Sequence, residues 1–122
     1  MGSNVLVVED EAVVAEDIKD LLTRAGYTTL GPVPNAKAAI DVVRSSPPDV
    51  ILMDVKMPGD LDGIEAAIVI QQSRNKPIPI IFISAYEQGN FPHLMVVSPF
   101  RYLKKPYDSK ELLRCISELC SA

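Results

Sequence analysis

Hydrophobic and polar residues follow two different periods along the chain, and the changes between them divide it into short strands and helices. The apolar run VLVV at residues 5–8 is continuous, as expected for a strand buried on both faces. Residues 11–25 instead carry apolar side chains at helical spacing, and Gly26 follows them as a stop signal. The first 26 residues therefore predict a strand followed by a helix.

The same alternation continues to the end of the chain. A cap at Asn35 begins a second helix, apolar spacing from Ile64 to Gln71 indicates a third, and Asp108 with Glu111 resembles a capping box for the last one. Strands that alternate with helices imply a parallel sheet between two layers of helices, an α/β three-layer sandwich. The further strands are predicted at residues 27–30 (closed by Gly31-Pro32), 50–53, 78–83 and 101–104.

The segment between the last two strands departs from this pattern. Residues 87–99 read EQGNFPHLMVVSP, in which Gly89 and Pro92 disfavour an early helix and Ser98-Pro99 ends a later one. Only about two turns are available, and isolated helices this short are marginal in water. We predict that this helix is short, distorted or mobile, next to a well-formed last helix.

Composition narrows the class of protein. With 122 residues, 48% hydrophobic and 23% charged, the chain suits one folded domain over residues 4–122, and we take residues 1–3 as start and cloning residues. A net charge of −4 argues against direct nucleic-acid binding, and no apolar run is long enough for membrane insertion. Cys115 and Cys120 would lie about 7.5 Å apart along one helix, too far for a disulfide, so we expect reduced thiols and a cytoplasmic protein.

Polar side chains follow four of the predicted strands. Glu9-Asp10-Glu11 comes after the first, Asp54 after the third, Ser84 after the fourth and Lys105 after the fifth. Parallel α/β sheets bind ligands beyond the carboxyl ends of their strands. Taken singly, Asp10 could cap a helix, Ser84 a turn, and Lys105 could be solvated. Together at one sheet edge, they favour a functional site.

Four motifs resemble the receiver domain of response regulators in two-component phosphorelay signalling: VLVVEDE, MDVKMPG followed by DG, FISA and YLKKPY. The resemblance implies a flavodoxin-like sheet of five strands in the order 2-1-3-4-5. It also implies that Asp54 accepts a phosphoryl group from a histidine kinase or a histidine phosphotransfer protein. Lys105 would balance the phosphoryl charge, Ser84 would hydrogen-bond the group, and Tyr102 would rotate as a switch.

A metal site follows from the same resemblance. Asp10 and Asp54 would bind Mg²⁺ directly, with the backbone carbonyl of Lys56 as a third ligand and Glu9 acting through a water molecule. Mn²⁺ or Ca²⁺ would substitute for Mg²⁺. Lys56 and Tyr86 would screen the acyl phosphate from water, and the bulk of Tyr86 is expected to slow hydrolysis. The Lys105-Pro106 peptide bond is expected to be cis.

The chain also differs from the commonest receivers. Gly59-Asp60-Leu61 makes the loop after Asp54 one residue longer, and Glu9 replaces the more usual aspartate. Before the last strand, Pro99-Phe100-Arg101 replaces the turn of small residues that is often found there. In this feature the chain resembles receivers linked to sensor histidine kinases, although this resemblance is weaker than that of the four motifs. His93, the sole histidine, is expected to be a surface residue and not a phosphoryl carrier.

Two functions remain open at this stage. The first is a phosphorylatable receiver that catalyses its own phosphoryl transfer and dephosphorylation and is otherwise not an enzyme. The alternative is a pseudo-receiver, an interaction module that is never phosphorylated. A haloacid-type phosphatase would need Asp-x-Asp after its first strand, which Glu9-Asp10-Glu11 does not supply. The sequence leaves open homodimerisation, the cognate kinase, the output, and whether the chain stands alone or is part of a longer protein.

Overall fold

Strands and helices alternate along the chain as the sequence predicted. The structure, a computed structural model, describes residues 3–92, 94, 97 and 99–120. The described strands form a parallel sheet in the order β2-β1-β3-β4-β5, the order that the resemblance implied. The elements are β1 (Asn4–Val8), α1 (Ala12–Arg24), β2 (Thr28–Val33), α2 (Ala36–Ser45), β3 (Val50–Asp54), α3 (Gly63–Gln72), β4 (Ile80–Ser84), the 3₁₀ helix η1 (Gln88–Asn90), β5 (Phe100–Lys104) and α4 (Ser109–Cys120).

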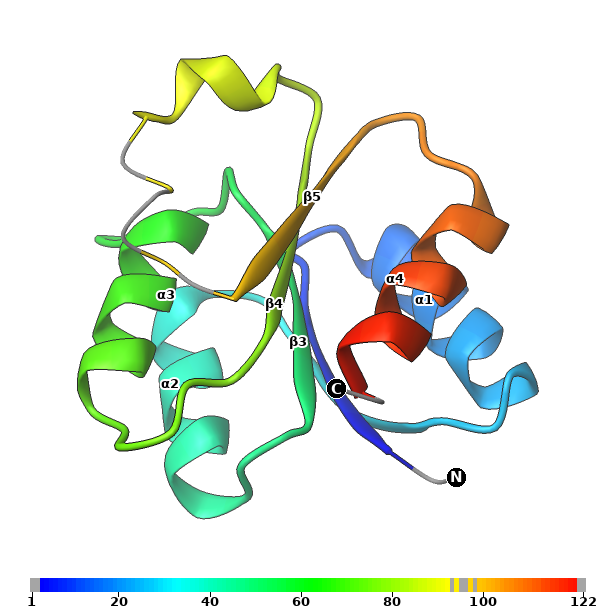
Figure 1. Ribbon diagram of the computed structural model, residues 1–122, viewed down its shortest axis with the longest axis horizontal. Helices are drawn as coiled ribbons and strands as arrows, with labels where there is room; N and C mark the ends of the chain where they lie inside the picture. The colour runs from blue at the N-terminus through cyan, green and yellow to red at the C-terminus, as the bar shows by residue number, and fades with distance from the viewer. Residues whose placement is uncertain (1–2, 93, 95–96, 98, 121–122) are drawn as a thin grey trace.

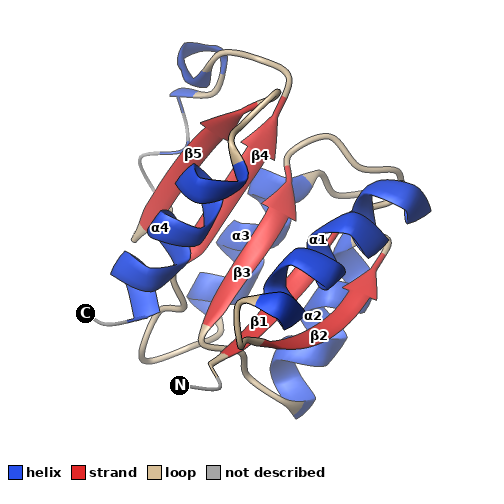
Figure 2. Cartoon of the chain, turned by 90° about the vertical axis from the view of Figure 1, so that its right-hand side faces the viewer, coloured by secondary structure: helices blue, strands red, loops and turns tan. Residues whose placement is uncertain are grey.

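Helices cover both faces of the sheet, which gives the three layers that were predicted. Helices α2 and α3 lie on one face, and α1 and α4 lie on the other (Figures 1 and 2). Successive strand residues point to opposite faces, so each central strand supplies both cores. Leu6 and Phe82 belong to the core under α2 and α3, whereas Val7 and Ile81 belong to the core under α1 and α4. Cys115 and Cys120 are free, in agreement with the prediction.

Strand β2 is longer than predicted. We expected Gly31-Pro32 to close it at Leu30, but it continues to Val33 through a cis Gly31-Pro32 bond. Gly31 has φ +82°, and a Cβ there would lie 2.8 Å from the Val33 nitrogen, so glycine suits this position. The extension has a consequence for the site: the Glu9 N–H donates to the Val33 carbonyl at 2.9 Å, which fixes the chain just beyond β1.

Of the two helix caps predicted from the sequence, one is present as expected and the other takes a simpler form. Asn35 caps α2, its side chain accepting a hydrogen bond from the Ala38 N–H, as predicted. At α4, the Asp108 side chain accepts from the Lys110 N–H at 2.9 Å, which is a simpler cap than the box expected with Glu111. A complete capping box is formed instead at α3, between Asp62 and Glu65. The capping box therefore fixes the first turn of α3.

The described part of the segment after β4 contains 3₁₀ turns and no α-helix. Beyond η1, the Leu94 N–H donates to the Phe91 carbonyl and the Val97 N–H to the Leu94 carbonyl, both three residues back. Phe91, Leu94 and Val97 are buried, at the spacing of three that places side chains on one side of a 3₁₀ helix. The prediction of a short, distorted helix is confirmed for these residues, and its mobility stays a prediction. His93 lies outside the described residues.

Candidate functional site

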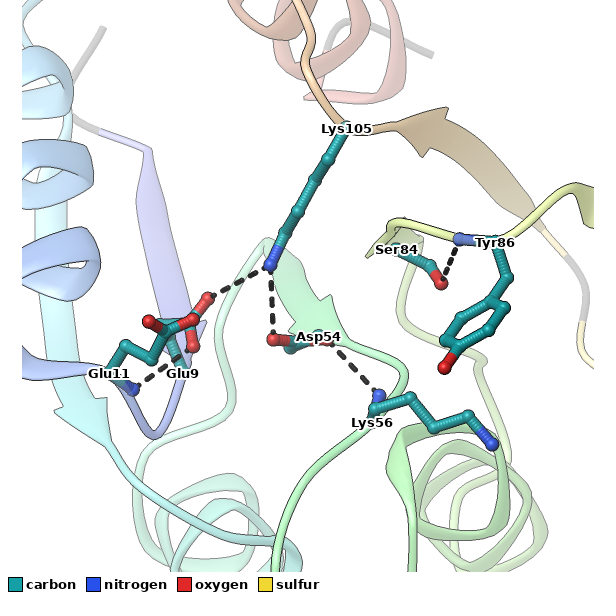
Figure 3. Close-up of polar contacts among 7 residues, drawn as sticks. All are labelled: Glu9, Glu11, Asp54, Lys56, Ser84, Tyr86 and Lys105. Carbon is teal, nitrogen blue, oxygen red and sulfur yellow. Dashed lines mark hydrogen bonds and ion pairs between the residues drawn. The ribbon is translucent and has the colours of Figure 1, made fainter.

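The carboxyl ends of the parallel strands bring the predicted polar residues together at one edge of the sheet. Asp54 and Ser84 are the last residues of β3 and β4, while Glu9 and Lys105 directly follow β1 and β5. Glu9, Asp54 and Ser84 are the buried polar residues of the described chain, which is otherwise apolar in its interior. Figure 3 shows the side chains of Glu9, Asp54 and Lys105 pointing toward one another.

Asp54 is held from two sides. Only 7% of the residue is exposed. Its Oδ1 accepts a hydrogen bond from the Lys56 N–H at 3.1 Å, and its Oδ2 lies 3.4 Å from the Lys105 ammonium nitrogen. A buried carboxylate needs such partners to remain ionised at low cost. The cost of placing Asp54 at the end of an apolar strand is therefore offset by one backbone donor and one cation.

Lys105 joins the two buried acids. Its Nζ lies 3.4 Å from Asp54 Oδ2 and 3.9 Å from Glu9 Oε1. Its own N–H donates to the Ser84 carbonyl at 2.7 Å, and the Lys105-Pro106 bond is cis, as predicted. Partial burial alone would lower the pKa of Lys105, but the carboxylates of Asp54 and Glu9 outweigh it and raise that pKa. Lys105 is thus a fixed positive charge beside Asp54.

Glu9 carries an unusually basic carboxylate. Burial, opposed in part by a hydrogen bond from the Glu11 N–H, raises its pKa from 4.5 to about 7, and the nearby Asp54 charge raises it too. One lysine does not offset the two buried acids, so the site has room for more positive charge. Such a group gains a proton or a cation more readily than an ordinary surface glutamate does.

The donor set fits a divalent cation. Each of Glu9, Asp10 and Asp54 offers a carboxylate oxygen, and these three oxygens lie within 4.8 Å of one another. Glu9 and Asp54 are buried, whereas Asp10 is exposed. Hard oxygen donors of this kind, with an excess of negative charge, are what Mg²⁺ and Ca²⁺ select. The part of the Lys56 carbonyl in such a site stays a prediction.

Tyr86 connects Ser84 with Tyr102. The Ser84 hydroxyl accepts a hydrogen bond from the Tyr86 N–H at 3.0 Å (Figure 3), and the Tyr102 hydroxyl donates to the Tyr86 carbonyl at 2.6 Å. Tyr102 itself is half-buried on β5. The residue proposed as a switch therefore contacts the loop that begins at Ser84, while its rotation is untested.

The sequence did not assign a role to the Phe91 side chain. This side chain is buried, and its ring lies 6.3 Å from both the Tyr86 and the Tyr102 rings. The Lys56 ammonium lies 5.5 Å from the centre of the Tyr86 ring and 5.6 Å from that of Phe91. Its burial has a local signal, since Phe91, Leu94 and Val97 recur every third residue, the 3₁₀ period. Its contacts with Lys56 and Tyr86 have no such signal in the sequence.

Comparisons with known proteins agree with this geometry. The family model described as response regulator receiver domain matches residues 5–117. The transcriptional regulatory protein PdtaR of Mycobacterium tuberculosis is 33% identical over 113 residues, which are 92% of this chain and 54% of PdtaR. The chemotaxis protein CheY of Thermotoga maritima is 25% identical over 119 residues, 98% of each chain. The chain thus spans about half the length of PdtaR and nearly all of this CheY.

The solved structures give the same result. The signal receiver domain of a modulated diguanylate cyclase from Desulfovibrio desulfuricans has a TM-score of 0.87 and 33% identity, covering 99% of this chain and 95% of that one. The Francisella response regulator 1452 receiver domain has a TM-score of 0.88 and 28% identity, with 98% of each chain covered. No helix in the described part of the chain could cross a membrane. The chain belongs to the receiver domains of two-component response regulators.

Proposed function

We propose that Asp54 accepts a phosphoryl group from the phosphohistidine of a histidine kinase or a histidine phosphotransfer protein. An Asp54 carboxylate oxygen forms a bond to phosphorus while the bond between phosphorus and the imidazole nitrogen breaks. The electron pair stays on the imidazole, which takes up a proton. In the proposed dephosphorylation, a water oxygen bonds to phosphorus while the bond between phosphorus and the Asp54 oxygen breaks. The electron pair stays on the regenerated Asp54 carboxylate, the attacking water gives up a proton to the solvent, and inorganic phosphate leaves.

The observation that carries this proposal is the position of Lys105, 3.4 Å from an Asp54 oxygen that is otherwise buried at the sheet edge. Lys105 would neutralise one phosphoryl oxygen, and the Ser84 hydroxyl would donate to another after transfer. Glu9 and Asp10, together with Asp54, would hold a divalent cation, Mg²⁺ by preference. When bound, this ion would supply positive charge for the phosphoryl oxygens and would offset repulsion among the three acids.

The proposal includes what the chain does not do. We propose no external substrate beyond the phosphoryl donor, so the chain is a self-phosphorylating and self-dephosphorylating switch and not an enzyme in the usual sense. A cytoplasmic location, with a kinase or phosphotransfer protein as partner, is part of the same proposal. The phosphoryl charge would act on the loop from Ser84 to Phe91 and on Tyr102, which border the site.

A phosphorylation assay tests this function. The purified chain is incubated with Mg²⁺ and acetyl phosphate and measured by intact mass spectrometry, with Asp54→Asn and a chelator as controls. We expect one added phosphoryl group that depends on both Asp54 and the metal. If the folded wild-type chain gains none from acetyl phosphate or from a phosphorylated histidine donor, the chain is a pseudo-receiver. If Asp54→Asn still gains the group, the assignment of the acceptor is wrong.

A further inference from the structure

Phe91 is anchored in the core although it lies in the irregular segment after β4. Only 8% of the residue is exposed, and it belongs to the core cluster under α2 and α3. Its N–H donates to the Gln88 carbonyl at 2.9 Å, and its carbonyl accepts from the Leu94 N–H at 3.1 Å. The backbone and the side chain of Phe91 are therefore both held in place, so its ring can fix the position of side chains that pack against it.

Two side chains from the site rest on this ring. The Lys56 ammonium lies 5.6 Å from its centre, and the Tyr86 ring meets it edge to face, at 6.3 Å and 89°. Lys56 also lies 5.5 Å from the Tyr86 ring, so the three groups contact one another in a closed set. Cations over ring faces and edge-to-face ring pairs are both favourable arrangements.

The backbones of the same two residues contact two side chains of the site. The Lys56 N–H donates to Asp54 Oδ1, and the Tyr86 N–H donates to the Ser84 hydroxyl. In Figure 3 the side chains of Lys56 and Tyr86 lie alongside each other, on the side of Asp54 that faces Ser84. Lys56 is exposed and Tyr86 is half-exposed, so each side chain would be free to turn into solvent without a fixed neighbour.

We propose that Phe91 is a positioning residue, which holds the side chains of Lys56 and Tyr86 together at the rim of the Asp54 site and so lengthens the lifetime of an aspartyl phosphate. The lifetime rests on the proposed function; the positioning does not. Hydrolysis requires a water oxygen to reach phosphorus as the bond to the Asp54 oxygen breaks. A rim that is held closed leaves fewer paths for that water, while a loose rim opens them.

The decisive comparison removes the ring without emptying the core. Phe91→Leu keeps an apolar side chain of similar size but loses the ring face that Lys56 and Tyr86 contact. After removal of the donor, we expect its phosphoryl group to be lost about fivefold faster than that of the wild type, a factor typical of one or two such contacts. Phe91→Tyr keeps the ring, so its lifetime should stay close to the wild-type lifetime.

Leu94→Val is the matched control. Leu94 is a buried anchor of the same segment, hydrogen-bonded to Phe91, but it lies outside the ring contacts described for Lys56 and Tyr86. If it shortens the lifetime as much as Phe91→Leu does at equal loss of melting temperature, general loosening explains the effect and the proposal fails. An unchanged lifetime in Phe91→Leu overturns it as well.

A double-mutant cycle measures the coupling between Phe91 and Lys56 in the phosphoryl lifetime, which a purely structural role of Phe91 would not produce. In a Lys56→Met background the cation is absent, so Phe91→Leu should have a clearly smaller effect on lifetime than it has in the wild type. Additive effects would contradict a joint action of the two residues at the rim.

Positioning is also measurable without phosphorylation. With 3-fluorotyrosine incorporated, the fluorine resonances of Tyr86 and Tyr102 should shift in Phe91→Leu, while those of Tyr27 and Tyr107, which pack on the other face of the sheet, should not. The Tyr86 resonance is assigned from Tyr86→Phe. If it stays in place in Phe91→Leu, the inference is wrong even when Asp54 is phosphorylated. If it moves but Asp54 gains no phosphoryl group, only the proposed function and the lifetime effect fail.

Discussion

Gly63 lies directly against the backbone of Asp54. A Cβ built at Gly63 would overlap the Asp54 carbonyl oxygen and would lie 3.0 Å from the Met53 Cγ. The Gly63 N–H donates to the Val55 carbonyl at 2.8 Å, and Asp62 caps α3 one residue earlier. The pair Asp62-Gly63, which the sequence offered as part of a motif, thus places the start of α3 against the end of β3 and supports Asp54 from behind.

Because of this contact, adding a single methyl group at Gly63 should destabilise the chain strongly. In Gly63→Ala the added methyl group must displace the chain at Asp54, since backbone atoms cannot move aside as a flexible side chain can. We expect a loss of about 2–4 kcal/mol in the free energy of unfolding, measured by urea denaturation. Gly89→Ala is the matched control: a Cβ there meets nothing within 4 Å, so the change should stay within about 0.5 kcal/mol. Equal effects of the two substitutions would show that the contact at Gly63 relaxes freely.

Tyr86 is expected to act through the bulk of its ring. Tyr86→Ala should shorten the lifetime of the phosphorylated chain by about threefold, which corresponds to about 0.7 kcal/mol in the barrier to hydrolysis. Its hydroxyl is not needed for screening, so Tyr86→Phe should keep the wild-type lifetime. The measurement is the decay of phosphorylated protein after removal of the donor. An unchanged or longer lifetime in Tyr86→Ala would refute the screening role.

The raised pKa of Glu9 should make the stability of the chain depend on pH. Its pKa is about 7 in the folded chain and near 4.5 when unfolded, so between these values the folded state holds a proton that the unfolded state has lost. Stability should therefore fall as pH rises from about 4.5 to 7, by at most about 3 kcal/mol, and level off above 7. Glu9→Gln should remove this part of the slope, as judged from urea denaturation at several pH values without metal.

A bound divalent cation should oppose this loss of stability with rising pH. A divalent cation binds the ionised carboxylates, so Mg²⁺ should stabilise the wild-type chain more at pH 8 than at pH 5. Glu9→Gln should weaken both this stabilisation and its dependence on pH. Without metal, a wild-type slope identical to that of Glu9→Gln would contradict the raised pKa.

The sequence predicted that these polar residues lie together, because parallel strands end at one edge of the sheet. Once Val5–Val8 and Val50–Met53 are recognised as buried strands, the acids that follow them must be neighbours, whatever the details of the loops. The extension of β2 was not predictable in this way, since Gly31-Pro32 is typical of a turn and only pairing with β1 keeps it in the sheet. The contacts of Phe91 were missed for a similar reason: they join residues 35 positions apart, Lys56 and Phe91, and no local pattern records such a distance.

The segment after β4 should open more easily than α4. The backbone N–H groups of Asn90, Phe91, Leu94 and Val97 each donate to the carbonyl three residues back, and 3₁₀ bonds of this kind have poorer geometry than α-helical ones. Helix α4 instead buries a continuous stripe that includes Leu112, Ile116 and Leu119. In the unphosphorylated chain we expect the amides of Asn90, Phe91 and Leu94 to exchange hydrogen at least about tenfold faster than those inside α4.

Native-state hydrogen exchange read by NMR resolves these amides one by one. Phe91 and Leu94 are buried, so slow exchange is a real alternative outcome: their side chains could hold the segment as firmly as the stripe holds α4. Equal protection in the two segments would mean that the anchors outweigh the weak backbone bonds, and the idea of an easily opened segment would fail. Fast exchange that slows after phosphorylation of Asp54 would instead show that the charge on Asp54 orders the segment through the loop that begins at Ser84.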